Sequence, residues 1–126
     1  MTALSAVLAC TACENAFSVE AGSDVACGPG TALQIHGGLE PEVAWSPGCR
    51  ASAVNLEAAA HGIRWELSAP GNLLLPPVRY GAPPAHAHET RVPVGPLLPG
   101  VTYTVTLQRD RGATARDTIA SATYTP

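Results

Sequence analysis

Basic residues are scarce in this chain. Seven Lys and Arg stand against ten Asp and Glu, which leaves a formal net charge of −3 over 126 residues. A stripe of positive charge that could follow a phosphate backbone is therefore not expected, and this argues against nucleic acid as a partner. The sequence also lacks a run of eighteen apolar residues. We therefore expect no ordinary transmembrane helix.

Aromatic residues are few as well. They make up 5% of the chain, whereas the hydrophobic content of 46% consists largely of Ala, Val and Leu. Twelve Gly and twelve Pro are scattered between short apolar runs. These frequent turn-forming residues favour many short strands over long helices. The length of the chain suits one domain.

The clearest strand pattern follows a Pro-Gly turn near the C-terminus. Across residues 101–107, aliphatic or aromatic residues alternate strictly with threonines. Neighbouring side chains of a strand point to opposite faces, so the pattern predicts a half-buried strand with Tyr103 inward and the threonines in water. Pro99 and Gly100 supply the turn in front of it.

Six further segments have alternating patterns or strand-forming runs between turn residues. Pro76 and Pro77 cannot donate ladder hydrogen bonds, so the segment that contains them is expected at a sheet edge or broken by a bend. Residues 81–89 contain prolines and are expected to form a loop. The expected strands are residues 32–36, 42–46, 49–58, 61–68, 72–80, 101–107 and 118–125. This spacing predicts an all-β fold, namely a single seven-stranded antiparallel β-sandwich.

The four cysteines allow a metal site, a redox pair or a disulfide. Cys10 and Cys13 form a C-x-x-C, but no second C-x-x-C follows, so the spacing gives a four-thiolate zinc site little support. A redox C-x-x-C would be expected in a βαβ setting, and the pattern of short strands offers none.

A disulfide between Cys27 and Cys49 fits the expected hairpin best. If residues 32–36 and 42–46 pair around Gly37 and Gly38, facing residues have numbers that sum to about 75 to 78. Cys27 and Cys49 satisfy this relation, which places both near the open end of the hairpin. Two separate buried thiols are the alternative.

Three motifs, "EVAWSPG", "PLLPGVTYTVTL" and "ASATYTP", together resemble a fibronectin type III domain over residues 32–126. In that family a tryptophan on the second strand lies in the core, and a leucine, a Pro-Gly turn and a tyrosine open the sixth strand. The resemblance implies that Trp45 is the core tryptophan, Leu98 the leucine before the turn, and Tyr103 the tyrosine at the sandwich corner. The proline-rich stretch "LLLPPVRYGAPP" departs from the family. The fold serves adhesion, spacing and binding, so it implies architecture more than mechanism.

The N-terminal sequence "VLAC" resembles the lipobox of bacterial lipoproteins, in which a small residue precedes the cysteine. The resemblance implies that Cys10 is lipidated and that the protein is anchored to the membrane of the bacterial cell envelope, outside the cytoplasm. A positively charged n-region is missing, so a start further upstream or an ordinary buried apolar segment are the alternatives. Residues 1–10 are thus interpreted as a signal-like segment, 11–30 as a flexible tether and 31–126 as the sandwich.

His86, His88 and Glu89 form the one compact cluster of potential metal ligands. On an extended segment, an H-x-H pattern puts both imidazoles on one side. A site would need a third ligand, for which Glu89 or His61 could approach. A polar loop tip is the preferred interpretation.

Catalytic motifs are missing from the sequence. No G-x-S-x-G appears, and the glycine pairs do not open a helix as phosphate-binding loops do. Trp65, Arg79 and Tyr80 could form a patch that stacks on a sugar or a peptide, but alternation places Trp65 in the core.

The sequence therefore predicts a non-enzymatic, envelope-tethered β-sandwich that serves as a binding or structural module, with no cofactor. Its candidate ligand is a protein or carbohydrate of the envelope. The alternatives are a small metal-binding protein or metalloenzyme that uses His86 and His88, and a carbohydrate-binding module.

Overall fold

The computed structural model describes residues 25–60 and 62–126, and all regular secondary structure in these ranges is β-strand. The strands are β1 (Ala32–His36), β2 (Glu42–Ser46), β3 (Ala53–Ala58), β4 (Gly62–Ser68), β5 (Val78–Arg79), β6 (His88–Arg91), β7 (Tyr103–Asp110) and β8 (Arg116–Tyr124). Nowhere in the described ranges does a helix reach the length and apolarity that crossing a membrane requires.

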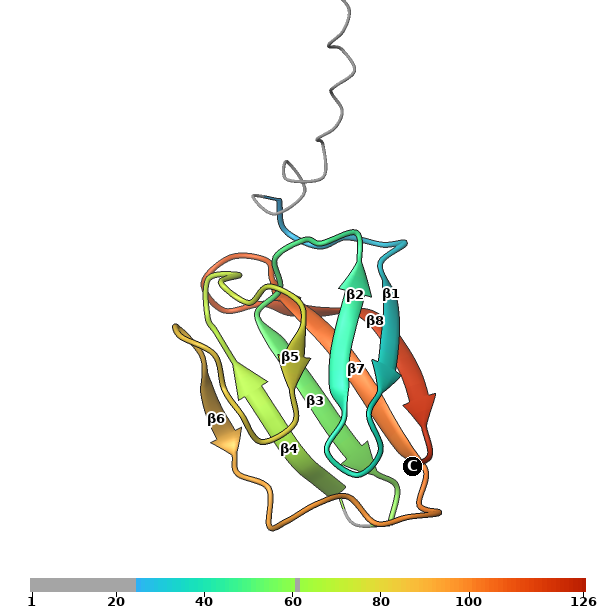
Figure 1. Ribbon diagram of the computed structural model, residues 1–126. Coiled ribbons are helices and arrows are strands. Elements are labelled where there is room, and N and C mark those ends of the chain that lie inside the picture. The colour runs from blue at the N-terminus through green and yellow to red at the C-terminus, as the bar shows by residue number, and fades with distance from the viewer. Residues whose placement is uncertain (1–24, 61) are drawn as a thin grey trace, which may run out of the picture.

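The strands form two antiparallel sheets. The smaller has the order β1-β2-β5 and the larger the order β6-β4-β3-β7-β8. The smaller sheet lies across the larger one, as Figure 1 shows. The predicted all-β sandwich is confirmed.

The eighth strand, β6, was not expected. It begins at His88, inside the segment predicted to be a loop, and pairs with β4 through Glu66 opposite Arg91 and Ser68 opposite His88. Its four residues, "HETR", have no apolar alternation. Pairing with a strand distant in the sequence, rather than local propensity, makes this segment a strand.

The β1–β2 hairpin has the expected register. Ala32 faces Ser46 and His36 faces Glu42. Gly37 has a φ of 116°, and a Cβ there would meet the Cα of Pro41 at 3.3 Å. The turn therefore requires glycine at this position.

The predicted disulfide between Cys27 and Cys49 is present, with a Cα–Cα distance of 4.9 Å and both residues buried. The N–H of Cys27 donates to the carbonyl of Arg50 at 2.7 Å, and the N–H of Arg50 donates to the carbonyl of Val25 at 2.8 Å. Residues 25–30, assigned to the tether from their small and Gly-rich composition, thus begin the folded domain. The crosslink and the backbone hydrogen bonds fix them. Cys10 and Cys13 lie outside the described residues.

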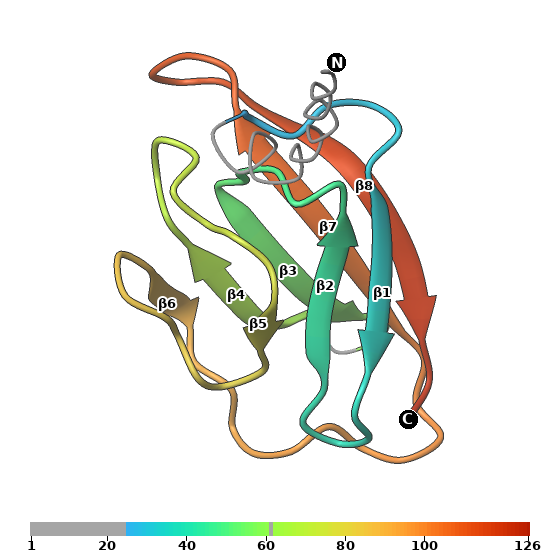
Figure 2. The ribbon, with the colours of Figure 1, turned by 45° about the horizontal axis from the view of Figure 1, so that its top comes forward.

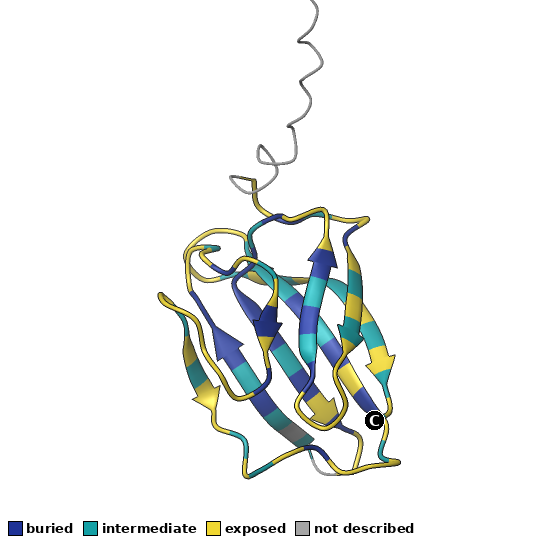
Figure 3. Ribbon diagram, viewed as in Figure 1, coloured by how far each residue is buried: buried dark blue, intermediate teal, exposed yellow. Residues whose placement is uncertain are grey.

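The core lies between the sheets and follows the strand alternation. Tyr103, Val105 and Leu107 of β7 are fully buried, whereas Thr104 is exposed. Figure 3 shows the alternation as bands along the strands. The residues packed in the core are Cys27, Val43, Trp45, Cys49, Ala51, Val54, Leu56, Ala58, Trp65, Leu67, Ala69, Leu74, Val78, Tyr80, Leu97, Tyr103, Val105 and Leu107.

Leu98 does not take the core position expected for it. It is 46% exposed, whereas the preceding Leu97 is 1% exposed and packs in the core. The N–H of Leu97 donates to the carbonyl of Leu39 at 2.9 Å, and that of Leu98 donates to the hydroxyl of Tyr103 at 2.9 Å. The backbone of Leu98 thus forms part of the corner, whereas the side chain of Leu97 packs in the core.

The proline-containing segment 72–80 is mostly not a strand. Leu74 makes a single bridge to Ala51, and the strand is limited to β5, which follows Pro76 and Pro77 at the edge of the smaller sheet. The expected edge position is correct. The two prolines shorten the strand because they cannot donate to a ladder.

Candidate functional site

The turn between β1 and β2 and the long connection between β6 and β7 meet at one end of the sandwich. Besides the bond between Leu97 and Leu39, the hydroxyl of Tyr80 donates to the carbonyl of Gly95 at 2.8 Å. The hydroxyl of Tyr124 donates to the carbonyl of Gly38 at 2.7 Å. These bonds hold both segments against the sandwich, at the lower end in Figure 1.

Several apolar side chains at this end face water. Val94 is 93% exposed, Val92 64%, Leu98 46% and Leu39 39%. Together with the exposed Pro96, these residues are called the apolar end below. Prolines at 93, 96 and 99 fix φ along the connection, which limits how far its backbone can fold these side chains inward. Exposed apolar side chains that gather at one end of a domain make that end a candidate interaction site.

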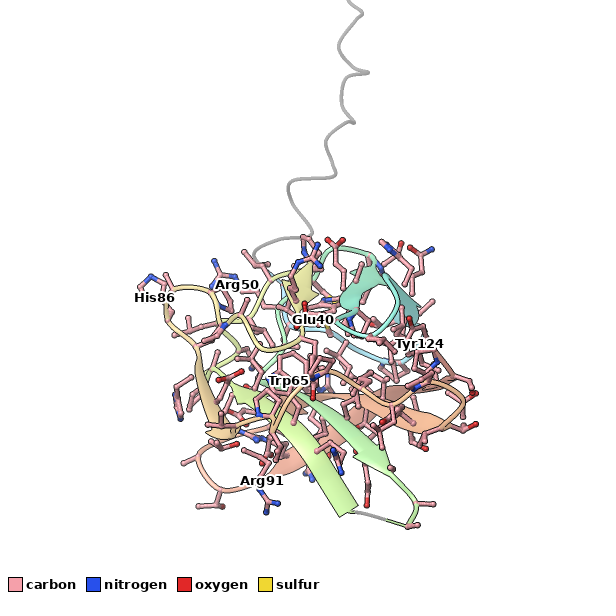
Figure 4. The ribbon with its side chains drawn as sticks, turned by 60° about the horizontal axis from the view of Figure 1, so that its bottom comes forward. Glu40, Arg50, Trp65, His86, Arg91 and Tyr124 are labelled. Atoms are coloured by element: carbon pink, nitrogen blue, oxygen red, sulfur yellow. A yellow bond between two sulfur atoms is a disulfide. The ribbon has the colours of Figure 1, made fainter. Side chains whose placement is uncertain are left out.

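A shallow hollow of about 410 Å³ lies beside the apolar end. It is lined by Gly37, Leu39, Glu40, Arg79 and Pro96. A guanidinium nitrogen of Arg79 donates to the carbonyl of Glu40 at 3.3 Å, so the Arg79 side chain is directed to the hairpin turn. Figure 4 views the molecule from this end and labels Glu40. The hollow has one cation, one carboxylate and apolar walls, which fits a mixed apolar and polar segment better than a strongly charged one.

The histidine cluster is not arranged as the H-x-H pattern implied. His86 has a φ of 68°, so the chain turns there instead of extending, and its side chain projects from the loop tip in Figure 4. His88 is exposed in β6. Glu89 accepts a hydrogen bond from the indole Nε1 of Trp65 at 2.8 Å. No group of three His, Cys, Asp or Glu within residues 25–60 and 62–126 is placed to hold a metal ion.

The aromatic residues considered for a stacking patch are in the core. Trp65 and Tyr80 are 0% and 5% exposed, and their rings meet edge to face with centroids 5.3 Å apart. Burial raises the pKa of Tyr80 above 10.0, although the nearby Arg64 opposes this shift. Arg79 is exposed at the hollow and does not complete an aromatic surface.

A polar cluster closes the opposite end, where the turn after β4 meets β7. The Asp110 carboxylate accepts bonds from the N–H of Gly71 at 2.8 Å and from Nε of Arg116 at 3.0 Å. The Asn72 amide bonds the backbone N–H and C=O of Asp110. Burial alone would raise the pKa of Asp110, but the hydrogen bonds from Gly71 and Arg116, together with the nearby Ser52 hydroxyl, outweigh it and hold this pKa below 3.8. The cluster fastens two loops and offers no open coordination or nucleophilic position.

Sequence reasoning missed both the apolar end and the Asp110 cluster. The segment "VPVGPLLPG" has the composition of a turn, and the exposure of its valines depends on how two distant loops meet. The only indication in the sequence was the density of apolar residues between prolines. Comparison of the chain with protein-family models, with curated proteins and with solved structures finds no match.

Proposed function

We propose that this protein is a non-enzymatic, fibronectin type III-like module, tethered to the bacterial cell envelope through a lipid on Cys10, that binds a partner through its apolar end. The observation that carries the binding proposal is the exposure of Val94, Val92 and Leu98 on a connection held in place by hydrogen bonds. A featureless spacer gains nothing from keeping such side chains in water.

The disulfide supports a location outside the cytoplasm. A buried Cys27–Cys49 bond hints at an oxidising compartment, because structural disulfides rarely persist in the cytosol. The first described residue, Val25, lies at the disulfide end of the sandwich, whereas the β1–β2 turn lies at the other end. In a protein anchored through its N-terminus, the apolar end would face away from the membrane.

Two contacts support the fibronectin type III likeness. Trp45 on the second strand is 4% exposed, and its Nε1 donates to the carbonyl of Cys49 at 2.9 Å. Tyr103 bonds the backbone of Leu98 across the Pro-Gly turn. Both features match the role that the family gives to these residue types.

The anchor and the binding surface are tested separately. Mass spectrometry of the native N-terminus should find a lipid-modified Cys10 as the first mature residue. The variant Cys10→Ser should no longer be found in the membrane fraction, although its domain should still fold. A mature chain that retains an unmodified Cys10 would contradict the anchor.

For the binding surface, we would place a photo-crosslinking amino acid at Val94 and, as the control, at Ala113, which is exposed on the connection between β7 and β8 at the other end. Crosslinking in the native envelope should give a discrete adduct from position 94 alone. Adding Leu39→Asp to the variant that carries the crosslinker at position 94 should abolish the adduct if the apolar end is the contact. Equal adducts from both positions, or none from position 94, would contradict the binding role.

A further inference from the structure

The last strand, β8, has a hydrogen-bonded neighbour on one side only. It pairs with β7 from Arg116 to Tyr124, with a register shift at Ile119, and no other strand in the described part of the chain pairs with it. β1 lies along the same margin, as Figures 1 and 2 show, but it belongs to the smaller sheet and pairs only with β2. Within residues 25–60 and 62–126, the outer edge of β8 therefore has no strand partner.

The ladder shows which backbone groups occupy that open edge. The N–H of Ser52, which directly precedes β3, donates to the carbonyl of Gln108 in β7. The backbone groups of Gln108 therefore point toward β3, and so do those of every second residue of β7 counted from Gln108. The residues between them bond toward β8, and their partners there include Ala122. By the same alternation, the N–H and C=O groups of Ser121 and Thr123 point away from β7. No strand of the described ranges uses these donors and acceptors, which have strand spacing.

Two other edge strands, β5 and β6, carry features that discourage strand addition. β5 has two residues and follows a pair of prolines, and β6 has four residues that include His88, Glu89 and Arg91. Short, charged or proline-flanked edges are poor templates for pairing. In contrast, residues 118–126 in and after β8 contain no charged side chain.

We propose that the outer edge of β8 pairs with the same edge of a second copy of this chain, antiparallel and about a two-fold axis at Ala122. This register pairs segment 118–126, which has no charged side chain, with itself. Ser121 then faces Thr123 of the second copy. The outward N–H and C=O groups of these two residues can therefore bond to each other across the interface.

Charge favours this partner. Each copy carries a net charge of −3, so two copies meet with least repulsion through an uncharged segment. The register also leaves Arg116 and Asp117 outside the paired segment, where Asp117 keeps its bond from Nε of Arg111 at 2.9 Å. The two five-stranded sheets would become one continuous sheet.

Sedimentation of the full chain tests the association, with Cys10→Ser and Cys13→Ser in every variant so that other thiols cannot link copies. We expect a monomer–dimer equilibrium that Thr123→Lys weakens by about tenfold or more, because it places like charges near the axis. Thr104→Lys is the matched control, because Thr104 of β7 lies opposite Thr123 of β8 on the same exposed face of the sheet. It should leave the equilibrium unchanged. A chain that stays monomeric at all concentrations, or equal effects of the two variants, overturns the proposal.

Crosslinking tests the register. The two copies of Ala122 would form a pair without mutual hydrogen bonds, with a Cα–Cα distance of about 4.5 Å, which suits a disulfide. Ala122→Cys should therefore give a covalent dimer on mild oxidation, while Ser121→Cys and Thr123→Cys should give severalfold less. A dimer linked equally well through position 121 or 123, or through none of the three, overturns the two-fold arrangement at Ala122.

Discussion

The hydroxyl oxygen of Tyr103 accepts a hydrogen bond from the backbone N–H of Leu98 at 2.9 Å, across a turn that contains Pro99 and Gly100. Tyr103 is fully buried, whereas the side chain of Leu98 is 46% exposed. One core residue thus bonds the backbone of a connection that exposes Val92, Val94 and Leu98. This bond adds to those from Leu97, Tyr80 and Tyr124 that hold the apolar end in place.

Shortening Tyr103 should destabilise the domain strongly. Tyr103→Ala removes a buried aromatic ring and should lower the free energy of unfolding by about 3 to 5 kcal/mol. Tyr103→Phe keeps the ring but leaves the N–H of Leu98 without its acceptor, at a cost of about 1 to 2 kcal/mol. Urea unfolding measures both. Tyr124→Phe, which loses a bond to Gly38 at an exposed position, should cost less than either. A loss below about 1 kcal/mol for Tyr103→Ala would contradict the burial.

Removing the disulfide should lower stability without changing the strand pairing. Cys27 and Cys49 are 22 positions apart, and a crosslink of that span contributes about 3 kcal/mol in the chain-entropy model. We expect this loss in urea unfolding of the double variant Cys27→Ala/Cys49→Ala, and a similar loss in the reduced wild type. Non-reducing peptide mapping should recover one fragment that links the two cysteines. A fragment joining Cys13 to Cys27 would contradict the structure.

Asp110 should make the domain sensitive to acid. Its pKa lies below 3.8 in the folded protein, so the ionised carboxylate favours folding. That contribution is fully present above the unfolded pKa and is lost as pH falls through the lower folded pKa. Asp110→Asn should therefore lower stability near neutral pH, and the difference from wild type should shrink below roughly pH 4. Urea unfolding between pH 3 and 7, roughly the range over which carboxylates titrate, measures it. Glu57→Gln, at an exposed position of β3, is the control. A constant difference across this range would show that the charge of Asp110 has no role.

Glu89 should contribute through the indole of Trp65 and not through a metal. Glu89→Ala leaves a buried indole N–H without its acceptor and should cost about 1 to 3 kcal/mol. His88→Ala, one residue away in β6 and exposed, should be nearly neutral. Adding Zn²⁺ to the wild type should not raise its melting temperature. Stabilisation by zinc that His88→Ala abolishes would restore the metal hypothesis.

Much of the fold could be predicted from alternation because solvent lies on one side of each strand and the core on the other. The pattern in residues 101–107 identified β7 and its buried face, and the turn at Gly37 gave the β1–β2 register. β6 could not be predicted because its stability comes from β4. The choice between Leu97 and Leu98 was not predictable either, since a connection has no periodicity that separates inside from outside.

The candidate site was less predictable than the fold. Arg79 was recognised as a functional candidate but was grouped with Trp65 and Tyr80, which are buried. Its actual neighbours are Glu40 and Pro96, which are distant in the sequence and come close only when the loops meet. Composition and local spacing cannot show which loops share one end of a sandwich.

The Cys27–Cys49 bond also determines how the domain would respond to mechanical load. The residues between these cysteines include all of β1 and β2. Tension applied through the N-terminal segment would cross from Cys27 to Cys49 through the covalent bond and continue toward β3. The hairpin would therefore carry no tension along its own backbone, and pulling could not lengthen the chain by the residues inside that loop. In a stretched molecule, the residues of β1 and β2 would remain inside a closed covalent loop after the rest of the sandwich had opened.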